Sequence, residues 1–138
     1  MKKSIVLLFT LFLCCNLYGC KNKDTTILNI NSITDISKIE IQNGPMKKNI
    51  TEAKDIKKIT EKLNNIEYNK KLESEDINGW NYVIRIYNST NKITNSITFA
   101  GNRINYRKSW YEVDSEFLNE IKKVYNEMDY NEKKYSDN

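Results

Sequence analysis

Histidine is absent from the 138 residues of this chain. Ser-His-Asp and Cys-His catalysis both need an imidazole as the base, so its absence excludes both, together with the usual zinc sites built from histidine and cysteine. An enzyme of this sequence would have to use carboxylate, lysine, tyrosine or serine chemistry. Arginine is also scarce, since lysine outnumbers it 19 to 3, and the three arginines are therefore the more informative cations.

A hydrophobic run long enough to span a membrane is also missing. The chain begins with a Met-Lys-Lys stretch at residues 1–3 and continues with an apolar segment over residues 5–13. Spanning takes about 20 apolar residues, and Asn16 and Gly19 interrupt the run well before that length. A positively charged start followed by a short apolar segment is typical of a signal peptide. We therefore predict that residues 1–19 are removed.

Cys20 stands at the end of this segment. In the stretch Leu17-Tyr18-Gly19-Cys20 a branched apolar residue lies three positions before the cysteine, and a small residue lies directly before it. This arrangement resembles the lipobox of bacterial lipoproteins, with a departure at Tyr18, where a small residue is usual. The resemblance implies that Cys20 receives a diacylglycerol and becomes the first residue of the mature chain. We therefore expect a lipid anchor at Cys20 on the outer face of the cell membrane, with ordinary secretion as the alternative.

The predicted mature chain has little net charge. Loss of Lys2 and Lys3 with the signal leaves 20 basic against 18 acidic side chains among the 119 residues from Cys20 onward. A nucleic-acid-binding protein needs a concentrated basic face, so we exclude nucleic acid as a partner. The length suits one domain. With Cys14 and Cys15 removed, the single remaining cysteine can form no internal disulfide.

The mature chain divides by composition. We expect a lipid-anchored tether over residues 20–32, a single domain over residues 33–128 and a flexible tail over residues 129–138. The tether is largely polar, and the tail has no hydrophobic periodicity. The alternative for the tether is that its aliphatic residues Ile27, Leu28 and Ile30 dock onto the domain.

Two helices and an antiparallel sheet account for the hydrophobic pattern of the domain. Apolar residues recur every three or four positions over residues 53–66 and 117–128, which predicts two amphipathic helices. Alternating segments separated by short turns predict a four-stranded meander between them. We therefore predict an α+β fold with both helices on one face of the sheet. The face under the helices is expected to carry Tyr82, Ile84, Ile86, Ile93, Ile97, Phe99, Ile104 and Tyr106.

Alternation sends the neighbours of those residues to the other face of the sheet. All three arginines are expected there, and arginine binds carboxylate or phosphate groups through planar, paired donors. We predict a binding face for an acidic protein, peptide or envelope ligand. The alternative is that an uncovered antiparallel face is polar without any role in binding. The residues nominated for binding are Arg85, Tyr87, Arg103, Asn105 and Arg107.

A second candidate is the aromatic and basic segment 106–111, which we expect at the tip of a hairpin. Trp110 and Tyr111 beside basic residues have the composition of a protein-binding hot spot. The alternative is that Trp110 simply covers the core.

The acidic loop over residues 72–79 is a weaker candidate. Its spacing resembles a calcium loop, but position twelve is Arg85, where an EF-hand needs a bidentate glutamate. We therefore expect no metal and no cofactor. Glu73, Glu75 and Asp76 could supply a carboxylate pair for glycoside hydrolysis. The alternative for these three residues is a solvated loop.

The order of elements over residues 33–128 also resembles that of uncharacterised domains of small Gram-positive lipoproteins, a resemblance that implies no activity. The sequence favours a membrane-anchored binding module outside the cell and argues against an enzyme. An immunity-type lipoprotein that binds a toxin or antimicrobial peptide is the alternative. A carboxylate-based hydrolase is a third hypothesis.

Overall fold

The computed structural model describes residues 26–30, 33, 35–72, 77 and 79–136. The two helices and the strands of one antiparallel sheet confirm the predicted α+β fold. In chain order the elements are β1 Thr26–Ile27, β2 Ile36–Asn43, β3 Met46–Ile50, α2 Ala53–Asn64, β4 Glu67–Leu72, β5 Tyr82–Asn88, β6 Ile93–Ala100, β7 Arg103–Tyr106, β8 Ser109–Val113, α3 Glu116–Glu127 and β9 Lys133–Lys134.

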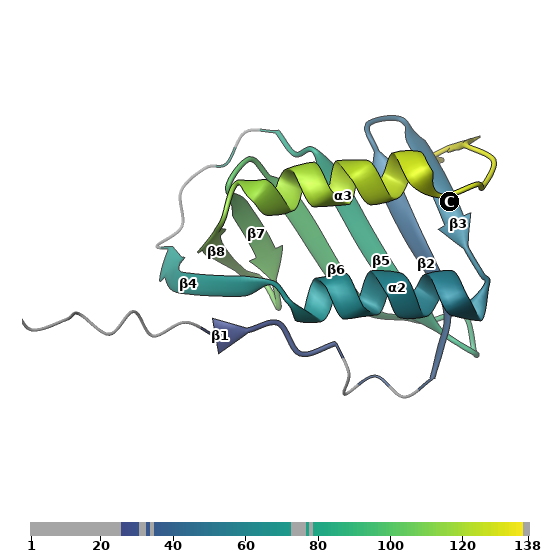
Figure 1. Cartoon of the computed structure of the whole chain (residues 1–138), viewed down its shortest axis with the longest axis horizontal. Helices are drawn as coiled ribbons and strands as arrows, with labels where there is room; N and C mark the ends of the chain where they lie inside the picture. Colours follow the sequence, from purple (N-terminus) through teal and green to yellow (C-terminus); the bar gives the residue numbers. More distant parts are fainter. Residues whose placement is uncertain (1–25, 31–32, 34, 73–76, 78, 137–138) are drawn as a thin grey trace, which may run out of the picture.

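The strands lie in the order β1-β4-β8-β7-β6-β5-β2-β3-β9 (Figure 1). Strands β5 to β8 form the predicted meander. The hairpin of β2 and β3 joins this meander beside β5, and its turn places Gly44 at a φ of 55° directly before Pro45. A two-residue hairpin turn of this kind needs a positive φ at its first central residue, which glycine adopts without strain. Strand β4 lies at the opposite edge of the meander, where it pairs with β8.

Both helices cover the same face of the sheet (Figure 1). Their buried stripes follow the helical period, with Ile56, Ile59 and Leu63 on α2 and Ile121, Val124 and Tyr125 on α3. Fully burying a large aliphatic side chain contributes about 1.5–3 kcal/mol, so this layer supplies most of the stabilisation. The sheet residues beneath the helices are Ile39, Ile41, Ile50, Tyr82, Ile84, Ile86, Ile97, Phe99, Ile104 and Tyr106.

Lys48 joins the edge hairpin to α3 from inside this layer. Its ammonium donates hydrogen bonds of 2.8 Å to the backbone carbonyls of Tyr125 and Met128. The last carbonyls of a helix have no intrahelical partner and carry its negative dipole end, so a cation there is stabilising. The otherwise costly burial of Lys48 is thus offset, and β3 is fixed against the end of α3.

The core extends further toward the N-terminus than predicted. Leu28 and Ile30 are fully buried, and their backbone amides donate hydrogen bonds to the carbonyl of Ile66 and the side chain of Asn64. The tether prediction is therefore wrong for residues 26–30, where the docked alternative holds for Leu28 and Ile30 but not for Ile27, whose side chain is exposed; residues 20–25 and 31–32 lie outside the described residues. Burial of the Leu28 and Ile30 side chains contributes more free energy than the chain loses in conformational entropy when the segment is fixed.

The segment after α3, predicted to be a flexible tail, also packs on the domain. Strand β9 pairs with β3 through Met46 and Lys47, and the amide of Tyr135 donates a 2.8 Å hydrogen bond to the carbonyl of Pro45. Without β9, the outer edge of β3 would present unpaired N–H and C=O groups. Such an edge readily pairs with another extended segment, here the residues after α3.

Ile93 is the exception to the predicted apolar face. The register between β5 and β6 shifts after Ile86, so that Ile93 pairs with Tyr87 on the uncovered side. The inserted residue of such a bulge reverses the side on which the following residues lie. The side chain of Ile93 is accordingly exposed.

Replacement of Ile84 by alanine should lower the free energy of unfolding by about 2–5 kcal/mol, because Ile84 is fully buried under the helices. Urea denaturation of the purified chain measures this change. Ile93→Ala is the matched control: that residue is 53% exposed, so its change should stay within about 0.5 kcal/mol. Equal effects of the two substitutions would contradict the assignment of faces.

Candidate functional site

The sheet face that α2 and α3 leave uncovered, here called the open face, gathers polar side chains from non-consecutive strands. Residues paired directly across antiparallel strands share a face, so the register identifies its members. One row runs through Ser96, Arg85, Glu40 and Asn49. A parallel row runs through Trp110, Asn105, Thr98, Val83, Gln42 and Lys47.

Glu40 is the most buried charged group of the open face, with only 3% of its side chain exposed. One carboxylate oxygen accepts a hydrogen bond of 3.0 Å from Nη1 of Arg85, and the other accepts one of 2.8 Å from the ammonium of Lys47. Nη1 of Arg85 also donates a 2.8 Å hydrogen bond to Gln42. Glu40 therefore fixes two cations, each from a neighbouring strand, at the surface of the sheet.

Burial of this network costs desolvation free energy. A desolvated carboxylate is tolerated only when paired and hydrogen-bonded, and here two cations satisfy both of its oxygens. The neighbouring phenol responds to the same environment: burial raises the pKa of Tyr87 above its usual value, and the charge of Glu40 raises that pKa further. Tyr87 consequently remains neutral at physiological pH beside the charged groups.

A hollow of about 470 Å³, here called the Arg85 hollow, opens beside this network. Two aromatic rings flank the cations. The Arg85 guanidinium carbon lies 4.8 Å from the ring centre of Tyr135, and the Lys38 ammonium lies 3.8 Å from that of Tyr87. Residues of the hollow include Lys38, Glu40, Asn49, Arg85, Tyr87 and Tyr135. Both β2 and the C-terminal segment thus contribute to a site that the meander alone would not form.

The nominated residues divide between different places. Arg85 and Tyr87 border the Arg85 hollow. Arg103 and Asn105 lie on the same face, in β7. Arg107 is not in a strand: with Lys108 it forms the turn between β7 and β8, where its guanidinium carbon lies 5.1 Å from the ring centre of Tyr106. The structure therefore brings together only two of the five.

Trp110 and Tyr111, the second candidate, lie on opposite faces of the sheet. Trp110 and Tyr111 belong to β8, and the hairpin tip itself consists of Arg107 and Lys108. Trp110 pairs with Asn105 and lies on the open face, whereas Tyr111 packs against the core with its ring 4.6 Å from that of Tyr68. Trp110 remains a candidate contact residue of the open face, and Tyr111 has a structural role.

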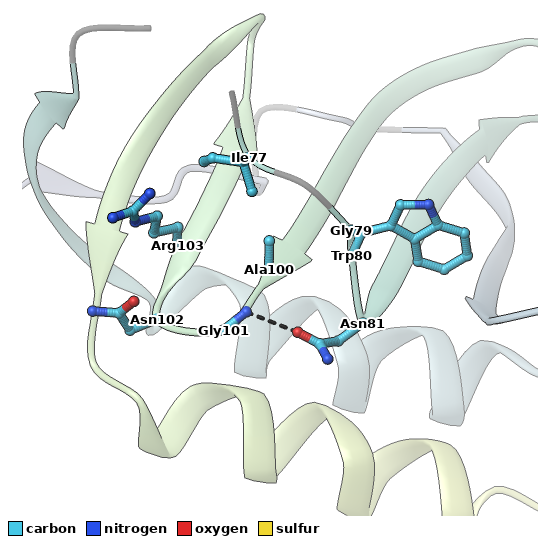
Figure 2. A pocket seen from close by; sticks show the side chains of 8 residues that line it. All are labelled: Ile77, Gly79, Trp80, Asn81, Ala100, Gly101, Asn102 and Arg103. Carbon is cyan, nitrogen blue, oxygen red and sulfur yellow. Dashed lines mark hydrogen bonds between the residues drawn. The ribbon is translucent and has the colours of Figure 1, made fainter. Parts of the chain in front are cut away.

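A second hollow, of about 440 Å³, lies where β5 begins and the β6–β7 turn ends. Figure 2 shows Trp80 and Arg103 on its two sides, with Asn81 accepting a 2.8 Å hydrogen bond from the amide of Gly101. The indole of Trp80 is substantially exposed. We call this place the Trp80 hollow; it gives Arg103 a different neighbourhood from that of Arg85.

Of the residues that line the Arg85 hollow, sequence patterns nominated only Arg85 and Tyr87 and missed the others, among them Glu40, Lys47 and Tyr135. Alternation along β2 places the side chain of Glu40 on the face opposite to that of Ile39 and Ile41, so the face of Glu40 could have been predicted. Its neighbours could not, because no local signal places β2 next to β5 or returns Tyr135 to the sheet.

Several sequence hypotheses concern residues that the structure does not describe. Cys20 and the acidic residues Glu73, Glu75 and Asp76 lie outside the described residues. Within the described part of the chain, no group of three or more His, Cys, Asp or Glu side chains is placed to hold a metal ion. Over the same residues, no helix is both long and apolar enough to cross a membrane. A comparison with known proteins finds no matching family model, curated protein or solved structure.

The Glu40–Arg85 pair should be energetically coupled. Glu40→Gln alone should lower the free energy of unfolding by about 1–3 kcal/mol, since a charged hydrogen-bond partner is lost. A double-mutant cycle with Arg85→Gln, followed by urea denaturation, should give a coupling energy of about 0.5–3 kcal/mol. The control cycle uses the exposed pair Lys57–Glu61, 3.9 Å apart on α2, whose coupling should be about 0.5 kcal/mol or less. Additive effects of Glu40→Gln and Arg85→Gln would show that the two side chains do not act as a pair.

Proposed function

We propose that this protein is a binding module anchored by lipid at Cys20 to the outer face of the cell membrane, and that the open face is its binding surface. The observation that carries this proposal is the burial of Glu40 on the sheet face that α2 and α3 leave uncovered. Its carboxylate holds Arg85 and Lys47 in fixed positions beside a hollow.

Stability alone does not account for such a network. Apolar residues of similar volume usually stabilise a protein at least as well as a buried ion pair does. A fixed arginine and exposed aromatic groups are, by contrast, enriched where proteins bind one another. The open face combines Arg85 and Tyr87 at one end with Trp110 nearer the other. This combination supports an acidic protein, peptide or envelope component as the partner.

The anchor part of the proposal is supported by the N-terminal sequence pattern and by the chemistry of acyl chains. Each buried methylene contributes about 0.8 kcal/mol, and stable attachment needs two chains or a second signal. A diacylglycerol on Cys20 supplies two.

Cys20→Ser should abolish lipidation. Cells fed an alkyne-tagged fatty acid should label the wild-type chain but not this variant, which should also retain residues 1–19 because lipidation precedes cleavage. Cys15→Ser is the matched control, since the neighbouring cysteine is removed with the signal, and it should label normally. Label on Cys20→Ser, or none on the wild type, would disprove the anchor.

A partner should be lost when the open face is altered. Cross-linked affinity capture from intact cells should recover a partner with the wild type, and Lys38→Gln combined with Trp110→Ala should reduce that recovery at least about tenfold, as expected for a hot-spot contact. The control is Lys57→Gln combined with Lys123→Ala on the helices, where both lysine side chains are largely exposed.

The control pair makes the result specific to one face. The open-face pair removes one lysine charge and the helix pair removes two, so a general effect of charge would reduce recovery in both, and more strongly in the helix pair. A partner lost only with the helix variant would place the binding surface on the helices instead. Equal recovery with all three chains, or no partner at all, would contradict the open face as a protein-binding surface.

A further inference from the structure

The Arg85 hollow has an excess of positive charge. Among the described residues that line it, Lys38, Lys47 and Arg85 are positively charged and Glu40 alone is negatively charged. Lys133 of β9 adds to this excess, because it pairs directly with Lys47 across the strands. Like charges placed opposite each other in a sheet are unfavourable. A bound anion would therefore relieve a repulsion that the folded chain maintains on this side of the sheet.

The cations retain donors for an occupant. A guanidinium has five N–H donors in a planar fork, and an ammonium has three. In the described part of the chain, the hydrogen bonds of Arg85 to Glu40 and Gln42 both use Nη1, and its flat face lies near Tyr135. The ammonium of Lys38 bonds to the side chain of Asn91 at 3.1 Å and lies over Tyr87. Within the described residues, these contacts leave further N–H donors of Arg85 and Lys38 for an occupant.

The walls of the hollow are not only cationic. The side-chain oxygen of Asn49 is buried and has no hydrogen-bond partner within the described residues. That oxygen is enclosed by the protein, so it does not select among ligands that enter from the surface. The exposed side chain of Ile93 and the ring of Tyr87 supply apolar contact on another wall.

We infer that the Arg85 hollow binds an acidic peptide segment, in which two neighbouring carboxylates meet Lys38, Lys47 and Arg85. The apolar part of such a segment fits against Ile93 and the ring of Tyr87, a contact that an inorganic phosphate would not make. This inference rests on the proposed function, because it names the ligand class for one end of the open face. Charge complementarity selects the occupant: the described lining residues include three cations and one carboxylate, an excess that two carboxylates neutralise.

Titration of the purified full chain with the dipeptide acetyl-Glu-Glu-amide tests this inference, with calorimetry or amide NMR shifts as the readout at constant ionic strength. Acetyl-Gln-Gln-amide is the matched ligand without charge. The acidic dipeptide should bind at least about tenfold more tightly, since charge-assisted hydrogen bonds are the stronger ones. Inorganic phosphate at the same ionic strength should bind more weakly than the acidic dipeptide.

Two variants locate the site. Lys38→Gln should weaken binding of the acidic dipeptide by about three- to tenfold, whereas Lys57→Gln removes the same charge from α2 and should leave binding unchanged. The ammonium of Lys38 contacts Asn91 and the ring of Tyr87 at the surface, so Lys38→Gln is the deciding variant.

The opposite results are equally clear. No difference between the acidic and neutral dipeptides, equal effects of Lys38→Gln and Lys57→Gln, or tighter binding of phosphate would each overturn the inference. These failures are distinguishable from failure of the proposed function. A partner captured through the open face but no affinity for the acidic dipeptide would refute the ligand class alone, and loss of capture in every variant would refute the surface.

Discussion

The constraint on which the structure depends is that one face of the sheet is apolar and must be kept from water. Both helices serve this purpose, and their stripes meet a layer of isoleucine and aromatic side chains that includes Ile41, Ile84 and Phe99. With α2 and α3 both on that side, neither remains to cover the other face. The polar character of the open face is thus a consequence of where the helices pack, and the Arg85 hollow is built there from strand residues and from the segment that follows β9.

Local alternation and helical period were sufficient to predict the two layers. Residues such as Ile84, Ile97 and Tyr106 lie under the helices as their spacing indicates, because the side of a strand residue follows from counting along the chain. Ile93 shows the limit of counting. One inserted residue between it and Asn95 reverses the side of the strand, and the sequence at that point carries no marker of the bulge.

The candidate site was predictable only in part, because it depends on contacts between distant segments. Arg85 and Tyr87 were found from the alternation of a single strand. Glu40 lies 45 positions earlier, and it meets Arg85 only because the β2–β3 hairpin attaches to β5 rather than to β4. Tyr135 comes from a segment without periodicity. The free edge of β3, rather than any pattern within that segment, accounts for its position.

The position of β1 at one edge of the sheet has a consequence for orientation. Neighbouring strands are about 4.8 Å apart, so the six steps from β1 to β2 separate the first strand from the Arg85 hollow by roughly 29 Å. The five residues between the proposed anchor at Cys20 and Thr26 can reach at most roughly 20 Å. Such a connection would keep the β1 edge within roughly 20 Å of the lipid surface. When the sheet stands upright on that edge, the Arg85 hollow lies farther from the anionic headgroups than the screening length of physiological salt, and the headgroups do not compete for it.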